Sequence, residues 1–548
     1  MSASTKAANG TQAKRALFSS RAAFLFAAIG SAVGLGNIWR FPYVAYENGG
    51  GAFLIPYLVA LLTAGIPLLF LDFAIGHRFR GSAPKAFRRI KGWAEPIGWI
   101  QVGIVFFITI YYSVIIAWAA IYAFKSIGQT WGSDANAHFF GDFLKFDGEK
   151  TTSLEFVPQI AIALLVIWVA VILVLALGVD RGIGKLSKIF IPTLTVLFVI
   201  VVIFALTLDG AVTGLNAFFT PNWEALMDSQ VWIAAYGQIF FSLSVAFGIM
   251  LTYASYLKPR SNLAGTGLVT AFANSSFEVL AGVGVFATLG FMATQAGVGI
   301  DEVAGGGIGL AFIAFPTVIS QMGGLFGSIF GVLFFLSLTI AGFTSLMSLL
   351  EVVVAAAQEK LDIGRVPAVL GIGGFMALLA LLLFPTTTGL STLDIMDRWT
   401  NQFGIVAVAL LTIIVVDWVL RRSDEFGMHL NAVSSFKVGT WWRICVVNIT
   451  PIVLGFTLIQ ELITQLQEPY GGYSSTQLNL FGWGVIGVIV AAALLLSIAP
   501  WRGEQYLAGP PGSDFGVHTS SVPQVGKPRL AEGRDSQRET RLNDEQEG

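Results

Sequence analysis

The stretch FLFAAIGSAVGLGNIWRFPYVAYENGGGAF, residues 24–53, decides how the whole chain is read. It begins as an apolar helix in which Gly30 and Gly34 stand four apart, a spacing that can form a packing face between membrane helices. Packing alone does not explain why Asn37 and Arg40 follow at membrane depth, where polar and ionisable groups are costly and usually functional. The stretch therefore predicts a functional segment inside a membrane helix.

We expect this helix to break at Ala32–Leu35. A break frees carbonyl groups, which can bind a cation, and creates a helix N-terminus, which can bind a carboxylate. Irregular backbone is tolerated at this depth only where it lines a cavity or is buried in protein. A dinucleotide-binding loop at Gly34 and Gly36 is excluded, because position 39 is Trp and no strand precedes the glycines.

A second weak point lies in QIFFSLSVAFGIMLTYASY, residues 238–256. Ser242 and Ser244 stand among aromatic residues, just before the Ala-Phe-Gly tripeptide at 246–248. A lone intramembrane serine usually bonds to its own helix. Two interrupted spans, one in each half of the chain, are instead the best sequence pointer to a transporter binding site near the membrane midplane.

Composition supports a membrane protein. Of the 548 residues, 55% are hydrophobic and 12% are charged, and the mean hydropathy is +0.74. A soluble domain carries about 25% charged residues. The net charge of −1 gives no sign of a nucleic-acid partner. The single Cys445 and the four scattered histidines offer no metal-binding spacing, which argues against a metal-dependent enzyme.

Twelve apolar runs are long enough to cross a hydrocarbon core about 30 Å thick. They cover residues 22–46, 52–76, 97–124, 157–178, 187–208, 230–257, 263–294, 325–357, 367–384, 398–420, 440–465 and 479–500. The first run is too long for a cleaved signal peptide. The sequence therefore predicts an all-α membrane protein with many spans.

Basic residues indicate the orientation in the membrane. They concentrate in alternate connections: 77–93, 178–188, Arg365, Arg421 and Arg422. The positive-inside rule makes these connections cytoplasmic, and both termini with them. Residues 1–14 and 501–548 cannot bury enough apolar surface to fold alone, so both are expected to be disordered and cytoplasmic.

Several stretches, in the same order, resemble the neurotransmitter:sodium symporter family and most closely its bacterial amino-acid branch: GSAVGLGNIWRFPY at 30–43, ENGGGAF at 47–53, GQIFFSLS at 237–244, TYASY at 252–256 and AGFTSL at 341–346. The resemblance runs from about Arg15 to about Gln465. It implies twelve transmembrane helices in two inverted five-helix repeats, with helices 1 and 6 broken, plus two extra helices. The implied units are 15–208, 230–421 and 440–500.

The resemblance also implies two sodium sites made of oxygen ligands, which a hard cation prefers. One sodium site would use Gly30, Val33, Ala341, Thr344 and Ser345. The other would use Ala32, Asn37, Ser242 and Asn274, together with the carboxylate of the substrate. A carboxylate that ligates an ion couples the two binding events, so each ligand strengthens binding of the other by the same factor.

An amino-acid pocket is implied by the same resemblance. The substrate's carboxylate would be held by Leu35, Gly36 and Tyr112, and the substrate's ammonium by the carbonyls of Ser31, Phe241 and Ser242. Its remaining walls would be Ala32, Ile108, Ser244, Phe247, Ser345 and Leu349. Taken alone, Tyr112 and Phe247 are more typical of packing. The walls are apolar or aromatic and carry no charge, which favours a neutral, largely hydrophobic amino acid. The methyl group of Ala246 disfavours the largest substrates.

Two gates and one flexible segment are implied as well. Arg40 and Asp397 resemble the external gate. Arg15, Phe18 and Glu359 resemble the cytoplasmic gate, although many relatives have Trp and Asp at the last two positions, and Arg15 alone is more typical of a membrane-flanking cation. Gly182 and Pro192 enclose nine residues, a family pattern associated with unwinding of helix 5. The alternative is a loop glycine and an ordinary membrane proline.

Glu278 stands where chloride-dependent relatives have a small neutral residue, usually Ser. We expect Tyr57, Gln238, Ser242 and Asn274 around its carboxylate. The resemblance implies chloride-independent transport in which Glu278 balances the sodium charge and can carry a proton outward when sodium has left. The alternative is an acid satisfied by hydrogen bonds between packed helices.

The sequence therefore predicts a symporter that imports a neutral amino acid with two sodium ions across a bacterial inner membrane, and not an enzyme. The external loop 126–156 has no cysteine pair and no Asn-x-Ser/Thr site of the animal type. Two alternatives stay open. A proton-coupled amino-acid permease of similar fold would show sodium-independent uptake, and a channel or receptor would show no coupled cycle.

Overall fold

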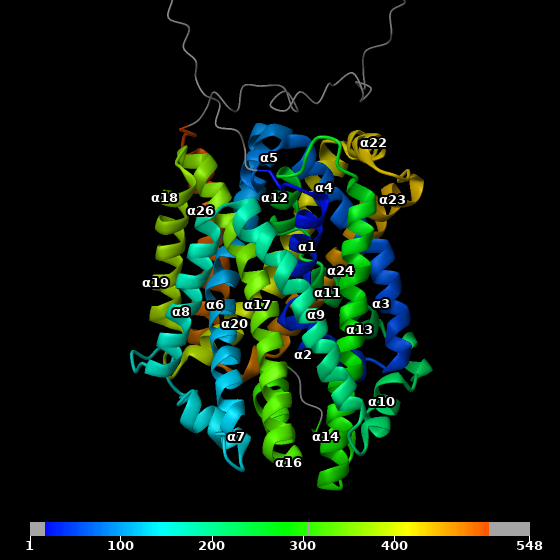
Figure 1. The fold of residues 1–548 in the computed structure, drawn as a ribbon. Coiled ribbons are helices and arrows are strands. Elements are labelled where there is room, and N and C mark those ends of the chain that lie inside the picture. Colours follow the sequence, from blue (N-terminus) through cyan, green and yellow to red (C-terminus); the bar gives the residue numbers. More distant parts are fainter. Residues whose placement is uncertain (1–16, 304–306, 503–548) are drawn as a thin grey trace, which may run out of the picture.

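The computed structural model describes residues 17–303 and 307–502. Within these residues the protein is helical, and extended backbone pairs only in two isolated bridges. The long helices run along one axis, and the described chain begins and ends at the same end of the bundle, where α5 (Ala83–Ile90) and α22 (Ser423–Val433) also lie (Figure 1). We call this end of the bundle the terminal side. We call the opposite end the vestibule side, after a large cavity on that side that is described below.

The helices follow the predicted order of spans. Those of the first five spans are α1 (Arg21–Ala32), α2 (Leu35–Glu47), α3 (Leu54–Ala60), α4 (Ile66–Phe79), α6 (Glu95–Gly128), α8 (Pro158–Ala176) and α9 (Lys185–Leu206). Those of the next five are α11 (Ser229–Ser242), α12 (Ile249–Ser255), α13 (Leu263–Ala296), α17 (Gly324–Leu361), α18 (Arg365–Ala368), α19 (Gly374–Leu383), α20 (Gly389–Arg398) and α21 (Val406–Ile413). Those of the last two are α23 (Thr440–Ile444), α24 (Thr450–Gln467), α25 (Ser475–Gln477) and α26 (Gly484–Ile498).

Connecting segments hold the remaining helices. They are α7 (Ala135–Ala137), α10 (Ala211–Phe219), α14 (Ile300–Val303), α15 (Gly307–Gly309) and α16 (Phe315–Met322). Polar caps start several of the long helices, because the first backbone N–H groups of a helix lack partners inside it. Ser20 accepts from Ala23 N–H at the start of α1, and Asn262 accepts from Gly265 N–H at the start of α13.

Ten described helices are long and apolar enough to cross a membrane. The pair α1 and α2 forms a further span that bends by 50° at its break. Helices α11 and α12 form another, interrupted at residues 243–248. The bent pair raises the number of candidate spans from ten to eleven, and the interrupted pair of α11 and α12 makes the arrangement consistent with the predicted twelve, with breaks in the first and sixth.

Two span boundaries differ most from the prediction. The fifth span begins at Val179 instead of residue 187, and the tenth begins at Gly389 instead of 398. Both added turns carry charged side chains, which lower the hydropathy of the sequence there. In α20 those side chains include Asp394 and Asp397, which face a cavity inside the protein and not lipid. Hydropathy alone therefore missed the start of this helix.

The two broken spans lie inside the bundle. Helix α1 packs against α9, α13 and α17, while α12 packs against α4 and α17. Helices α6 and α17 pack along each other beside the breaks. Irregular backbone at membrane depth is thus covered by protein, as the lack of water in the bilayer core requires.

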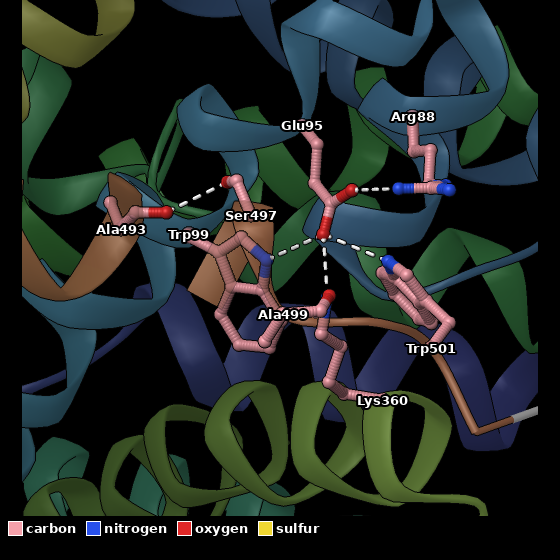
Figure 2. A network of polar contacts seen from close by, with 8 residues as sticks. All are labelled: Arg88, Glu95, Trp99, Lys360, Ala493, Ser497, Ala499 and Trp501. Carbon is pink, nitrogen blue, oxygen red and sulfur yellow. Dashed lines mark hydrogen bonds and ion pairs between the residues drawn. The ribbon is translucent and has the colours of Figure 1, made fainter. Parts of the chain in front are cut away.

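On the terminal side, one buried carboxylate joins several segments (Figure 2). The Glu95 carboxylate is 1% exposed. It accepts from four donors, Arg88 at 2.6 Å, Lys360 at 3.0 Å, Trp99 at 2.9 Å and Trp501 at 2.8 Å. Because Trp501 follows α26, this cluster ties the end of the described chain to α5, α6 and α17.

Replacing Glu95 by Ala should destabilise the protein strongly, because it leaves the ammonium of Lys360 buried without its carboxylate. Removing one partner of a buried ion pair costs about 3–5 kcal/mol. We expect a clearly lower melting temperature in detergent micelles. The matched control is Asp424→Ala, which removes a pair with Arg443 whose side chains are 61% and 56% exposed. Equal melting temperatures for the two variants would show that the cluster does not stabilise the fold.

Candidate functional site

A cavity of about 60 Å³ lies between the two helix breaks. Every residue that the sequence predicts around a substrate lines it: Ser31, Ala32, Leu35, Gly36, Ile108, Tyr112, Phe241, Ser242, Ser244, Phe247, Ser345 and Leu349. Six further residues complete the lining: Gly34, Asn37, Tyr111, Ile249, Asp397 and Asn401. The structure thus brings the predicted set together, while the role of each residue stays a prediction.

The wall of this cavity is not free of charge, contrary to the expectation from sequence. Asp397 was predicted only as part of a gate, yet it lines the cavity on the vestibule side. Tyr111 and Asn401 were not predicted at all. Tyr111 directly precedes Tyr112 on α6, and Asn401 lies four residues after Asp397, so both come from stretches that the sequence had already linked to the site.

At the first break, the start of α2 faces the cavity. Leu35 N–H donates to the Tyr112 hydroxyl at 3.2 Å, and Gly34 N–H donates to Asn37 Oδ1 at 2.9 Å. A Cβ atom on Gly36 would lie 2.3 Å from the Phe241 ring, so only glycine fits this close approach. The break therefore presents backbone amides of a helix N-terminus between two aromatic side chains.

At the second break, the backbone alternates between ordinary and left-handed conformations. The φ angles of Ser244, Ala246 and Gly248 are 53°, 65° and 84°. For a residue with a Cβ atom such a conformation costs about 1–3 kcal/mol and persists only where the surroundings hold it. Ala246 N–H donates to Asp72 Oδ2 at 2.8 Å, and the Ser244 hydroxyl donates to the Ser31 carbonyl at 3.2 Å. The two breaks therefore stabilise each other.

Asp72, which supports the second break, was missed by the sequence reasoning. It stands alone in the apolar run IPLLFLDFAI of α4 and is 3% exposed. An isolated carboxylate at membrane depth is by itself a sign of function. That sign was present in the sequence, but not the contact with Ala246, since residues from distant spans form it.

The first predicted sodium group gathers where α1 ends against the middle of α17. The Ser345 hydroxyl donates to the carbonyls of Gly30 and Ser31 at 3.3 and 3.2 Å. The Thr344 hydroxyl donates to the Ala341 carbonyl at 2.9 Å. Val33, the last predicted ligand, directly follows α1 with extended backbone. The predicted ligands thus gather around the end of α1.

The second predicted group forms one chain of hydrogen bonds across three helices. Asn37 Nδ2 donates to Asn274 Oδ1 at 2.8 Å, and Asn274 Nδ2 donates to the Ser242 hydroxyl at 3.1 Å. All three side chains are buried. Ala32 and Ser242 also line the cavity. The amide and hydroxyl oxygens that a hard cation prefers therefore lie against the space available to a substrate.

Glu278 lies one turn of α13 beyond Asn274 and is 0% exposed. Gln238 Nε2 donates to its Oε1 at 2.6 Å, and the Tyr57 hydroxyl donates to its Oε2. The Tyr57 hydroxyl also contacts the Ser275 hydroxyl at 2.8 Å, a neighbour that the sequence did not predict. Two of the expected partners thus bind this carboxylate directly.

A larger cavity of about 670 Å³, which we call the vestibule, lies next to the inner cavity. The two cavities share six lining residues: Leu35, Gly36, Tyr112, Phe241, Asp397 and Asn401. Within the described residues no ion pair joins Arg40 to Asp397, although both line the vestibule. The Arg40 guanidinium lies instead over the Phe241 ring, 4.7 Å from its centre. The inner cavity therefore opens toward the vestibule.

The terminal side is closed by packed aromatic residues. Phe18 is 1% exposed and makes edge contacts with Tyr253 and Tyr256 at 5.8 and 6.3 Å. Phe18 N–H donates to the Tyr256 carbonyl at 3.1 Å. Glu359 accepts from the backbone N–H and hydroxyl of Ser82 at 2.9 and 2.7 Å. Arg15, the predicted partner of Glu359, lies outside the described residues.

The segment between Gly182 and Pro192 is helical. Gly182 lies in the π-helical turn Val179–Gly184, which leads directly into α9, and Pro192 lies inside α9. Proline removes one helical hydrogen bond and glycine weakens a helix. This stretch is therefore helical in the structure but has a low intrinsic helix stability. Unwinding of the stretch stays a prediction.

The geometry defines a class of protein before any comparison is made. Two interrupted membrane helices meet around a cavity that opens to one side, with oxygen-rich clusters behind it, which is the arrangement of a secondary transporter. The chain belongs to the sodium:neurotransmitter symporter family, whose model matches residues 15–138 and 130–502. The family consists of sodium-coupled transporters and not enzymes.

Individual relatives agree with this assignment. The chain is 40% identical over 484 residues to the uncharacterised sodium-dependent transporter MJ1319 of Methanocaldococcus jannaschii, covering 88% of this chain and 97% of that one. It is 32% identical to the sodium-dependent serotonin transporter of Drosophila melanogaster, covering 81% of this chain and 76% of that one. The sodium- and chloride-dependent neutral and basic amino acid transporter B(0+) of Homo sapiens is 29% identical, with 87% and 84% covered.

A solved structure supports the fold. The crystal structure of MhsT in complex with L-phenylalanine has a TM-score of 0.69 and 31% sequence identity, and the match covers 82% of this chain and all of that one. Together with the breaks in the first and sixth spans, this likeness confirms the predicted class of fold.

Asp72→Ala should weaken the response of the protein to sodium. The substitution leaves Ala246 N–H buried without its acceptor, which costs about 1–3 kcal/mol, and loosens the break that directly follows Ser242. Sodium should therefore raise the melting temperature of this variant less than that of the wild type. Asp72→Asn keeps an acceptor oxygen and should recover part of the shift. An unchanged sodium shift in Asp72→Ala would contradict a supporting role.

Proposed function

We propose that this protein imports a neutral, largely hydrophobic amino acid together with two sodium ions by alternating access. One observation carries the proposal. The amide-bearing start of α2 and the chain of Asn37, Asn274 and Ser242 border one cavity. A carboxylate held by that helix start can reach a cation held by those side chains, so substrate and ion would bind as a unit.

The substrate would lie along the two breaks. Leu35 and Gly36 N–H groups and the Tyr112 hydroxyl would bind its carboxylate, and carbonyls of Ser31 and Phe241 its ammonium. Leu349 and the other apolar walls would surround its side chain. A hydrophobic amino acid fits these walls, and MhsT was crystallised with L-phenylalanine.

Asp397 does not make the cavity suited to a cationic side chain. Its carboxylate Oδ1 already accepts from Asn401 Nδ2 at 2.8 Å, and it lies at the vestibule edge of the cavity and not among the apolar walls. The methyl group of Ala246 narrows the second break. We therefore favour neutral amino acids smaller than the largest aromatic ones.

Two sodium ions and a zwitterion would carry two net charges inward per cycle. Moving one charge across 100 mV is worth about 2.3 kcal/mol, so two contribute roughly 4.6 kcal/mol. At about 1.4 kcal/mol per tenfold change, the membrane potential alone supports roughly three decades of accumulation. Coupling to two ions is therefore sufficient for strong uptake.

The direction of transport follows from the orientation that we propose. Under the positive-inside rule, the basic connections favour a cytoplasmic location for both termini, and the vestibule would then face outward across a bacterial inner membrane. Phe18, Glu359 and Arg15 would form the cytoplasmic gate. Unwinding between Gly182 and Pro192 would hydrate the inner sodium site and release its ion. Arg40 and Asp397 would close the vestibule.

A panel of the twenty amino acids tests the proposal directly. Neutral hydrophobic amino acids should raise the melting temperature of the purified protein in sodium and not in choline. In proteoliposomes, uptake of the same amino acids should be electrogenic and should vanish when choline replaces sodium. Equal uptake in choline would reject sodium coupling and favour a proton-coupled permease.

Asn37→Ala sharpens this test, because Asn37 would ligate an ion that the substrate also ligates. Sodium affinity and substrate affinity should therefore fall together. Thr63→Ala serves as the control, since the Thr63 hydroxyl bonds to Val59 O and Tyr236 away from the cavity. Loss of only one of the two affinities in Asn37→Ala would contradict a shared site.

Glu278 would supply the negative charge that balances sodium. Its carboxylate is buried beside Gln238 and Tyr57, within one turn of Asn274. With sodium bound nearby, the ionised carboxylate is favoured. After sodium leaves, the buried carboxylate favours a proton, which the empty carrier would then export, and this export would reduce the net charge moved per cycle from two to one. Transport should therefore be independent of chloride and stimulated by an internal excess of protons.

Glu278→Ser should make transport depend on chloride, since an anion would have to replace the missing carboxylate. Uptake would be measured in chloride and in gluconate. Ser275→Ala is the matched control, because it removes a partner of Tyr57 but keeps the carboxylate, and it should stay independent of chloride. Equal uptake by Glu278→Ser in gluconate would show that Glu278 does not compensate charge.

A further inference from the structure

The charged side chains of the vestibule are not equally paired. Four of them line this cavity: Arg40, Asp394, Asp397 and Arg398. Asp394 accepts from the hydroxyls of Tyr470 and Tyr473 at 3.0 and 2.9 Å. Arg398 forms an ion pair with Glu461 at 2.5 Å. Asp394 and Arg398 therefore each have strong partners of their own.

Asp397 is held by neutral groups. Asn401 Nδ2 donates to Asp397 Oδ1 and to its backbone carbonyl, both at 2.8 Å. The same amide nitrogen contacts the Tyr111 hydroxyl at 3.2 Å, and that hydroxyl lies beside the Asp397 carboxylate. Asn401 and Tyr111 are 8% and 1% exposed. The Asp397 carboxylate is thus oriented by the buried amide of Asn401 and the buried phenol of Tyr111.

Arg40 has no comparable partner. Among the described residues it makes no hydrogen bond and no ion pair, and its guanidinium rests on the face of Phe241. Arg40 and Phe241 are both half-buried, and a cation on an aromatic face gains about 0.5–2 kcal/mol, less than a bidentate ion pair with a carboxylate would give. The vestibule therefore holds one weakly bound cation and one carboxylate that is oriented by neutral donors.

We propose that Asn401, supported by Tyr111, keeps the vestibule open by holding Asp397, and that closure requires Arg40 to displace Asn401 from this carboxylate. The inference rests on the proposed transport cycle, in which Arg40 and Asp397 meet when the vestibule closes. A guanidinium binds a carboxylate best through both oxygens in one plane. The bond from Asn401 to Oδ1 fixes the orientation of the carboxylate, so turning both oxygens into the plane of the Arg40 guanidinium competes with that bond.

Asn401 is on this view a positioning residue that sets how easily the gate closes. Without its amide, Asp397 can turn toward Arg40 at lower cost, and the closed state with substrate bound becomes more populated. Apparent affinity rises with the fraction of protein that is competent to close. A hydrogen bond to a charged group supports an effect of about tenfold, or about 1.4 kcal/mol.

The test measures closure through a cysteine in the vestibule. The sequence has one cysteine, Cys445, which is buried, so Cys445→Ser with Leu390→Cys gives a single reporter in the vestibule wall. A charged thiol reagent then reports the substrate concentration that gives half-maximal protection in sodium. Asn401→Ala should lower this concentration about tenfold. Gln402→Ala, one residue along, should leave it unchanged. An unchanged or higher concentration in Asn401→Ala would overturn the inference.

Two further arms separate the inference from the transport proposal. Tyr111→Phe removes the hydroxyl beside Asp397 and should shift protection in the same direction by a smaller factor, which keeps the test valid if Asn401→Ala does not fold. In an Asp397→Asn background, Asn401→Ala should add nothing. The same shift in that background would show that Asn401 acts elsewhere and would reject the inference alone. A wild type without sodium-dependent protection would reject the transport proposal itself.

Discussion

The whole structure depends on one constraint: backbone polar groups released inside a membrane must find partners within the protein. Val33 and Gly34 interrupt the first span, and residues 243–248 interrupt the sixth. The backbone groups at each break find hydrogen-bond partners in the other break and in a few side chains. The Ser31 carbonyl accepts from the Ser244 hydroxyl, and the Ala246 N–H donates to Asp72. The groups that remain accessible around the cavity are the ones that can bind an ion and a zwitterion.

Rigid surroundings make the breaks usable. Helices α6 and α17 pack along each other beside the cavity, and the Glu95 cluster fixes their ends on the terminal side. The proposed gates rely on weaker contacts, such as Arg40 on the Phe241 ring and the aromatic packing around Phe18. Strong contacts therefore lie in the scaffold and weak contacts lie where the protein has to move.

Much of this could be predicted from sequence, because hydrocarbon thickness dictates the length of apolar runs and because glycines beside polar groups mark the breaks. The substrate lining followed from the family resemblance, and the structure places all of it around one cavity. Asp72 escaped prediction because its contact with Ala246 joins distant spans, and Tyr111 and Asn401 escaped because their contact with each other forms only when α6 packs beside the tenth span. The start of α20 was missed because its polar turn faces an internal cavity. A hydropathy profile cannot distinguish such residues from residues exposed to solvent outside the membrane.

The central claim is that the substrate carboxylate and a sodium ion share ligands at the first break. The most direct test compares a transported amino acid with its carboxamide analogue, which lacks the negative charge of the carboxylate. The affinity of each ligand for the purified protein is measured at increasing sodium concentration. We predict that sodium strengthens binding of the amino acid strongly and binding of the carboxamide little. Equal strengthening of both ligands would contradict a carboxylate that binds the ion directly.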